Sequence, residues 1–242
     1  MALSFGEQIH ALTGFDGDSA SASEIGENYD DVTAEWMNIS VREVVSLLPP
    51  QMLQRCAKAG SAFAPSTGEA HEEKVISVIR TRNTEGTPQF DNPNDVFVCR
   101  EIPFMQSHKA SDPDSLEHAT ETDPVFYYEP QTDGTAVKIK VLPASSSNVA
   151  KVYSVDYPVF DADGSGTNTN IKTATSIANF PNEVENLIVL RAAISAAEYQ
   201  LAIEEDVELY TPIIALLKSQ YQEGVMVLKT GNIVPPQQQK AR

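Results

Sequence analysis

The chain has 242 residues, with 34 acidic and 17 basic side chains, which gives a formal net charge of −17. Binding to nucleic acid through phosphates needs clustered Lys and Arg, so this balance argues against a nucleic-acid groove formed by one subunit. No run approaches the ~20 apolar residues that cross a bilayer. The first residues, Met1 to Glu7, lack the basic and apolar regions of a secretory signal. We therefore expect a soluble protein made in the cytoplasm.

The amino-terminal part predicts three helices and an acidic linker. Residues 1–15 predict a short helix, in which Ser4 and Glu7 have the spacing of a capping box. Residues 16–31 predict a flexible acidic linker. A second helix is expected from Thr33 to Leu48, ended by the following prolines. A third is expected to begin at Pro50 and to end at a Gly60 cap.

The central part changes to the period of two that is typical of strands. Enrichment in β-branched and aromatic residues predicts five strands, at residues 74–80, 96–100, 125–129, 136–141 and 152–157. A hairpin turn is expected at Thr132-Asp133-Gly134. Because no helices separate the later strands, they predict an antiparallel, β-rich insertion.

The carboxyl-terminal part carries two apolar stripes at helical spacing. A helix is expected from Pro181 through a first stripe, and Thr211-Pro212 is expected to open a second helix that ends before Gly231. Four acids separate the stripes, and the two helices predict an αα-hairpin. Residues 231–242 have nothing to bury, and we expect them to be extended and, in the isolated subunit, disordered.

These elements predict an α+β fold. A helical bundle would combine the N-terminal helices with the C-terminal αα-hairpin, with a β-rich insertion between them and an extended tail. The expected boundaries are 1–62 for the N-terminal helices and linker, 63–178 for the insertion, 179–230 for the αα-hairpin and 231–242 for the tail.

Motifs for chemistry are weak. Asp161, Asp163 and Ser165 resemble the first ligands of an EF-hand calcium loop, but Lys172 stands where the closing Glu should be. His108 and His118 lie in an acidic loop without the tight spacing of a zinc site. We find no nucleophile elbow, P-loop or dinucleotide motif. We therefore expect no enzyme activity, metal or cofactor, with a polar turn at 161–165 as the default interpretation.

The two cysteines, Cys56 and Cys99, form neither a disulfide framework nor a metal motif, which favours a reducing compartment. Trp36 has two interpretations, a core anchor for the N-terminal helices or an anchor between subunits.

An ordered series of segments resembles a family of tailed-bacteriophage virion proteins, the head-to-tail connector (adaptor or neck) subunits. The segments are residues 36–49, 99–113, 122–128, 141–143, 155–158 and 180–193. The resemblance spans about residues 32 to 200 and does not include the acidic N-terminal extension or the Pro235-Pro236 tail.

The resemblance implies a virion location and a homo-oligomeric ring, usually a dodecamer, that docks on the portal protein and joins it to the tail. Striped helices would pack between subunits through Leu187, Leu190, Ile194, Leu201, Ile214, Leu217 and Tyr221. The tail would enter the portal through Ile233, Val234, Pro235, Pro236, Lys240 and Arg242. The acids Glu204, Glu205, Asp206 and Glu208 would face the channel, where like charge lets DNA pass without binding.

Three other functions stay open from the sequence. The chain could be another neck or tail structural protein, such as a terminator or a decoration subunit. It could be an interaction module that holds Ca²⁺ in its acidic loops. The least supported alternative is a virion-associated hydrolase.

Overall fold

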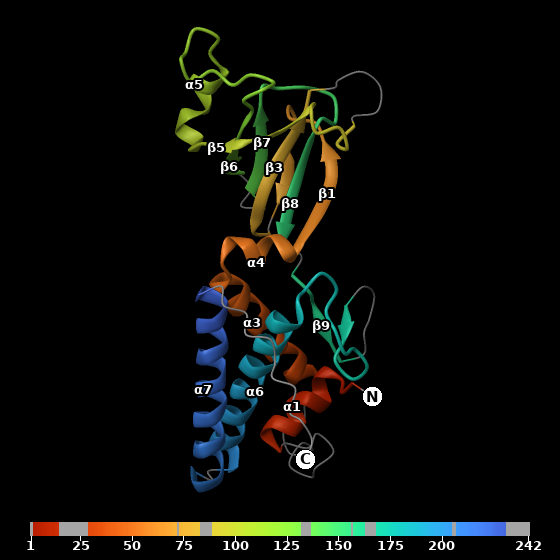
Figure 1. Cartoon of the computed structure of the whole chain (residues 1–242), viewed down its shortest axis with the longest axis vertical. Coiled ribbons are helices and arrows are strands. Elements are labelled where there is room, and N and C mark those ends of the chain that lie inside the picture. The colour runs from red at the N-terminus through yellow and green to blue at the C-terminus, as the bar shows by residue number, and fades with distance from the viewer. Residues whose placement is uncertain are drawn as a thin grey trace. The chain divides into compact units, whose positions relative to one another are not determined.

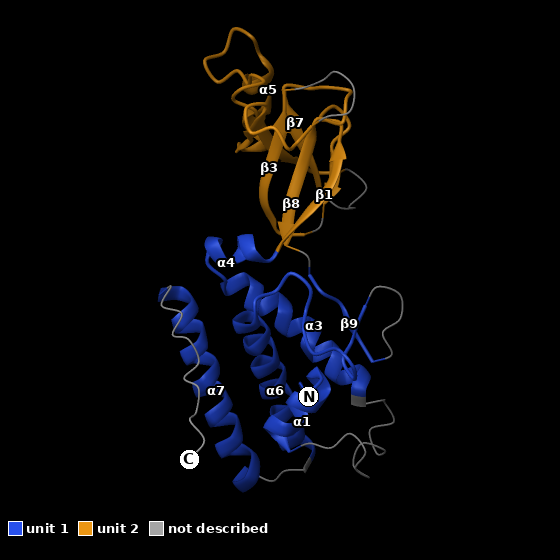
Figure 2. Cartoon of the chain, turned by 45° about the vertical axis from the view of Figure 1, so that its right-hand side comes forward, with its two compact units in different colours: residues 1–56, 157–242 blue, residues 57–156 orange. Residues whose placement is uncertain are grey.

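The computed structural model describes residues 2–14, 29–71, 73–82, 89–131, 137–155, 157–162, 168–204 and 207–230. Helices and mostly antiparallel sheets are both present, which confirms the expected α+β class. The chain forms two compact units, one of residues 1–56 with 157–242 and one of residues 57–156 (Figure 2). The sequence predicts insertion boundaries at 62/63 and 178/179, whereas the second compact unit begins at residue 57 and ends at residue 156.

In the helical unit, α1 (Phe5–Thr13) has the expected capping box. The Ser4 amide donates to Glu7 Oε2 over 2.7 Å, and the Glu7 amide donates to Ser4 Oγ over 3.3 Å. Gly14 ends the helix with a left-handed φ of 72°, a conformation that glycine adopts without steric cost. Phe5 and Ile9 are buried, so this short helix is fixed by packing as well as by its caps.

Helix α3 (Tyr29–Leu47) is followed by α4 (Pro50–Arg55), which begins at the proline expected to open it. The expectation that this helix continues to a Gly60 cap is wrong. Residues Ala57–Phe63 form strand β1 of the other unit, paired antiparallel with β8 (Ala150–Val155). The segment is rich in alanine and lacks β-branched residues, so pairing with a neighbouring strand, rather than local propensity, determines its conformation.

Helix α6 (Asn182–Glu204) lies between α7 (Val207–Thr230) on one side and α1 and α3 on the other (Figure 1). Its buried residues point to several sides rather than one, since the four consecutive residues Leu187, Ile188, Val189 and Leu190 are all buried. A helix that is apolar around most of its surface is buried on most of its surface. This pattern makes α6 the centre of the helical unit.

The expectation that Thr211-Pro212 opens the last helix is wrong. Helix α7 begins at Val207, and Pro212 lies within it. Proline lacks the amide hydrogen that would bond to the carbonyl four residues earlier, at Glu208. The helix nevertheless continues across the proline, and burial of Tyr210 and Ile214 on either side anchors both parts of it.

Residues 157–181 belong to the helical unit and contain the short parallel pair β9 (Phe160–Asp161) and β10 (Thr169–Asn170). Asn38 of α3 holds Phe160 by two bonds: its Oδ1 accepts from the Phe160 amide over 2.7 Å, and its Nδ2 donates to the Phe160 carbonyl over 3.1 Å. The Phe160 ring packs edge-on against Phe5, with centroids 5.6 Å apart. These contacts attach the segment to α1 and α3.

The second unit contains two four-stranded sheets. One has the order β1-β8-β3-β4 and the other β2-β7-β6-β5. The remaining bounds are β2 (Glu69–His71), β3 (Val75–Thr81), β4 (Val96–Val98), β5 (Arg100–Glu101), β6 (Val125–Glu129) and β7 (Val137–Leu142). A 3-10 turn (Phe104–Gln106) and α5 (Ser107–Ser111) lie between β5 and β6. All described pairings in these two sheets are antiparallel except β5 with β6.

One apolar cluster joins the two sheets. It combines Val78 and Val152 from the first sheet with Phe126, Ile139 and Val141 from the second. The sheets therefore share a core, as in a β-sandwich. The expected strand at 96–100 is divided at Cys99, where the chain passes from β4 in one sheet to β5 in the other.

Strand β6 coincides with the expected strand 125–129, and β3 and β7 lie within a residue of their expected bounds. β8 ends before the expected limit at Tyr157. β6 and β7 pair antiparallel, and the expected turn Thr132-Asp133-Gly134 lies outside the described residues.

Candidate assembly surfaces

The apolar stripes of α6 and α7 are largely occupied within the chain. Five of the seven residues expected to contact neighbouring subunits are buried here, namely Leu187, Leu190, Ile194, Ile214 and Leu217. Leu201 and Tyr221 are half-buried. Because the five buried side chains pack inside the helical unit, the expectation that they form contacts between subunits is corrected. For Leu201 and Tyr221, which are partly exposed, the expectation stays a prediction.

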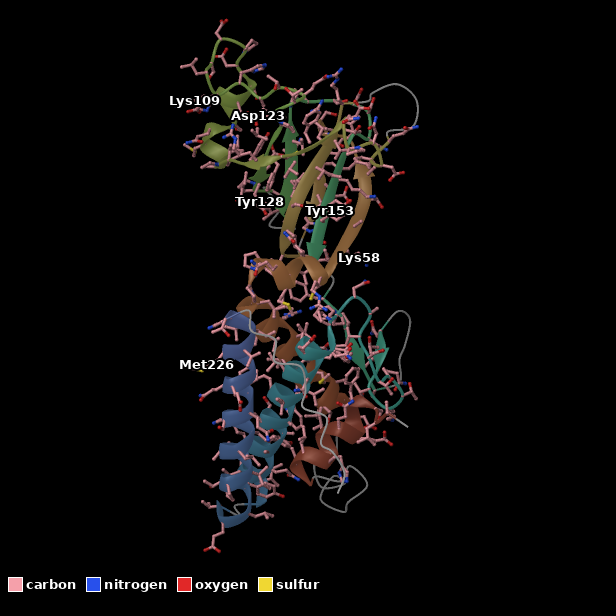
Figure 3. All side chains as sticks on the ribbon, in the orientation of Figure 1. Lys58, Lys109, Asp123, Tyr128, Tyr153 and Met226 are labelled. Carbon is pink, nitrogen blue, oxygen red and sulfur yellow. The ribbon has the colours of Figure 1, made fainter. Side chains whose placement is uncertain are left out.

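The apolar side chains that α7 does expose lie away from the side on which it packs. Leu209, Leu216 and Met226 are 51%, 59% and 68% exposed, respectively. Met226 lies on the side of α7 opposite α6 (Figure 3). Ile203 at the end of α6 and Val207 at the start of α7 are exposed as well. Single exposed apolar residues are common, but several along one helix mark a surface that a partner can cover.

A polar cluster links α3 to α6. The guanidinium of Arg191 in α6 donates to both carboxylate oxygens of Glu43 in α3, through Nε to Oε2 and through Nη2 to Oε1, the latter over 3.2 Å. Its Nη1 also donates to Ser195 Oγ over 3.0 Å. The hydrogen bond to Glu43 raises the pKa of Arg191. Burial, followed by the nearby Glu43 charge, raises the pKa of Tyr221 in α7.

Trp36 is half-buried and packs edge-on against Tyr199 of α6, with ring centroids 5.4 Å apart. The tryptophan therefore joins α3 to α6 within the chain. Its exposed remainder leaves the second interpretation, an anchor between subunits, as a hypothesis.

A groove of about 770 Å³ opens on the helical unit between α1, α6 and α7. Its apolar part consists of Leu12, Leu187, Leu190, Val227 and Leu228, and its polar part of Asn182, Glu183, Asn186, Gln220 and Glu223. Gly224 also lines it, and Leu187 packs where a side chain at position 224 would lie. The groove therefore has apolar walls with acidic residues among them.

The β-rich unit exposes a second apolar group. Phe104 and Met105 in the 3-10 turn are 45% and 77% exposed, and Leu116 after α5 is fully exposed. Lys109 and Asp123 belong to the same protruding part of the unit (Figure 3). Several acids surround it in the sequence, including Asp112, Asp114 and Glu117. A protruding loop with apolar side chains among charges is typical of a contact site.

The described residues supply no set of metal ligands that would support the calcium interpretation of 161–165. Asp161 lies in β9, and its Oδ2 accepts from Asn168 Nδ2 over 3.4 Å. Asp163 and Ser165 lie outside the described residues. Within the described ranges, no three His, Cys, Asp or Glu side chains form a group that could hold a metal ion.

The remaining expected site residues fall mostly outside the described structure. Glu205, Asp206 and the tail 231–242, with Ile233, Val234, Pro235, Pro236, Lys240 and Arg242, are in that group, as is the side chain of Glu204. Glu208, at the start of α7, is exposed. None of the helices that the structure describes has the length and apolar character to cross a membrane.

Protein-family models give no match to this chain, and neither do curated proteins at a significant level of similarity. The exposed surfaces of the two units and the resemblance of the sequence segments are therefore the features that bear on function.

The sequence did not reveal the groove or the exposed side of α7. Helical spacing identifies apolar positions, but it does not say which of two apolar flanks a neighbour covers. One signal was available for α7, because Leu209, Leu216 and Met226 lie outside the stripe defined by Ile214, Leu217 and Tyr221.

Proposed function

We propose that the chain is a structural subunit of a phage head-to-tail connector ring that docks on the portal protein, joins it to the tail and forms part of the DNA channel. The observation that carries this proposal is the row of exposed apolar side chains on α7, Leu209, Leu216 and Met226. The ordered resemblance of the sequence segments to connector subunits supports the same class.

The helices supply a rigid wall for such a ring. In this proposal α6 and α7 form an αα-hairpin that completes a bundle with α1 and α3, and the exposed side of α7 packs against the next copy. A stable interface buries about 800 Å² on each partner. The three exposed residues, together with Ile203 and Val207 near the start of α7, supply an apolar centre for an interface of that kind.

The β-rich unit then serves as the seat for a neighbouring ring or tail protein. Phe104, Met105 and Leu116 are exposed on a protruding segment, where they can contact a partner without disturbing the shared core of the two sheets. Burying apolar side chains of this size contributes about 1.5 to 3 kcal/mol each when the burial is complete.

Two further features have a role in this proposal. They are the acids where α6 meets α7 and, separately, the C-terminal tail. Glu204, Glu205, Asp206 and Glu208 would face the channel and repel the phosphates of passing DNA. Residues 231–242 would dock into the portal. Deleting residues 231–242 should abolish portal docking if the chain is the adaptor, and should have little effect if it is a terminator or a decoration subunit.

Changing exposed apolar residues to Glu distinguishes the roles of the two surfaces, the exposed side of α7 and the exposed apolar group of the β-rich unit. Leu216→Glu with Met226→Glu should prevent ring formation on the portal, measured by sedimentation velocity of the purified chain with its portal protein. The matched control Leu116→Glu, in the β-rich unit, should leave ring formation intact and weaken attachment of the next tail component. If Leu216→Glu with Met226→Glu assembles like the unmodified chain, α7 is not the contact surface and the proposal fails.

A further inference from the structure

We infer that the groove between α1, α6 and α7 binds residues 231–242 of the same chain and holds this segment in the free subunit. The inference goes beyond the proposed function, because it assigns a second binding site to the tail before any portal is present. It also replaces the expectation that residues 231–242 are disordered in the isolated subunit. It does not require that the chain is a connector subunit. Three features favour this occupant: the position at which α7 ends, the apolar surface of the groove and its charge.

The end of α7 lies at the groove, which favours this occupant. Thr230 is the last residue of α7, and Val227 and Leu228, within one turn of it, already line the groove. Along α7 the groove extends from Gln220 to Leu228, which corresponds to about 12 Å of helix. The twelve residues that follow Thr230 can span up to about 40 Å when extended, so the segment can reach every part of the groove.

The composition of the segment matches the apolar walls. Gly231-Asn232 comes directly after α7, and both residue types readily adopt the left-handed conformation that reverses a chain at a helix end. Ile233-Val234-Pro235-Pro236 follows, a short apolar run that favours an extended conformation. Such a run loses little conformational entropy when it lies in a groove lined by Leu187, Leu190 and Val227.

The charges are complementary as well. The charged residues that line the groove are both acidic, Glu183 and Glu223. The charged side chains of residues 231–242 are both basic, Lys240 and Arg242. Opposite charges at the rim of an interface favour the correct register and weaken as salt rises. A segment with this order, apolar first and basic last, is therefore suited to this groove.

Attachment to the same chain decides which copy supplies the segment. A short flexible connection gives an effective concentration in the millimolar range. A second copy at micromolar concentration competes poorly with that. In the free subunit the groove therefore holds its own tail, and a portal that binds the tail has to remove it from the groove.

A cross-linking experiment on the full chain tests the placement. Gln220→Cys with Val234→Cys should form an intramolecular disulfide on mild oxidation, at least tenfold faster than the matched control Gln222→Cys with Val234→Cys. Gln220 lines the groove, whereas Gln222 is exposed on α7 and is not among the groove residues. The native Cys56 and Cys99 are buried and do not interfere. Equal rates for the two pairs, or disulfides mainly between copies, would overturn the inference.

A peptide titration tests the chemistry of the groove. A fluorescein-labelled peptide of residues 231–242 should bind a chain that ends at Thr230 at least tenfold more tightly than it binds the full chain, measured by fluorescence polarisation. Glu183→Lys with Glu223→Lys should weaken binding to the shortened chain at least fivefold at low salt. The control Glu208→Lys, also on α7 but not in the groove, should not. Circular dichroism confirms that each variant is folded.

The outcomes separate this inference from the proposed function. Equal affinity of the peptide for both chains, or no effect of the two groove lysines, refutes tail binding even if rings still form on the portal. Conversely, tail binding in the groove can be observed with a chain that never assembles into a ring. In that case the inference stands and the connector proposal fails.

Discussion

Gly224 of α7 lies directly against Leu187 of α6: a Cβ on Gly224 would lie 2.5 Å from Leu187 Cδ2. This distance is shorter than any ordinary carbon contact, so a side chain at position 224 would require Leu187 to move or the two helices to separate. Both residues line the groove, so this contact forms part of its wall.

Gly224→Ala should destabilise the chain by about 1 kcal/mol. The gain in helix propensity, about 1 kcal/mol, opposes an overpacking cost of about 1 to 3 kcal/mol. The control Gly6→Ala should be stabilising, because a Cβ there meets only the Ile171 carbonyl oxygen at 3.5 Å. Urea unfolding measures both. If Gly224→Ala stabilises as much as Gly6→Ala, the tight contact with Leu187 does not exist in solution.

The pair of Glu43 and Arg191 should contribute about 1 kcal/mol of coupling energy. The pair is bidentate but partly exposed, with 45% and 25% of the two side chains accessible, so solvent screens much of its attraction. A double-mutant cycle with Glu43→Gln and Arg191→Met in urea unfolding measures this term. The more exposed pair of Glu198 and Lys218 is the control and should give less than about 0.5 kcal/mol. Equal coupling in both cycles would contradict the account.

Glu185 should make stability fall as pH rises through its titration. Its Oε1 accepts from the Ile177 amide over 2.6 Å, but burial is the larger effect and raises the pKa of Glu185. The folded state therefore holds the proton more tightly than the unfolded state between the ordinary glutamate pKa and the raised one, and stability decreases across that window. Above the window, Glu185→Gln should be at least as stable as the unmodified chain.

This pH dependence is measured as the difference between the two unfolding curves, which removes the contribution of the many other acids. The difference should shrink as pH is lowered through the window, because the protonated carboxyl and the amide are then alike in charge. The quantity to compare is the stability of Glu185→Gln minus that of the unmodified chain. If this difference is smaller at neutral pH than at pH 4, the sign that burial predicts is wrong.

Both cysteines should be inert in the folded chain. Burial raises the pKa of Cys56 to about 11 and that of Cys99 to about 12, so the reactive thiolate is scarce at neutral pH. A thiol reagent such as DTNB at pH 8 should titrate neither thiol without denaturant and both in 6 M urea. Rapid labelling of the native chain would show that one of the two sites opens.

Local signals in the sequence were sufficient for several elements. The Ser4 and Glu7 capping box, Pro50 at the start of α4 and the alternating residues of β6 each encode their structure within a few residues, and each is found where expected. In these cases the local preference and the final packing agree.

Other elements depend on partners that are distant in sequence. Strand β1 has little β-propensity of its own and pairs with β8, about 90 residues later. Pro212 looks like the start of a helix, yet α7 already begins at Val207. The groove depends on Gly224 meeting Leu187 across two helices, which no periodicity reveals.

We propose that the exposed side of α7 joins copies of this chain on a portal. Sedimentation velocity of the purified chain, alone and with its portal protein, tests it most directly. We predict a complex of many copies with the portal, lost when Leu216 and Met226 are changed to Glu and retained when Leu116 is. A chain that sediments as the same single species with and without the portal would contradict the account.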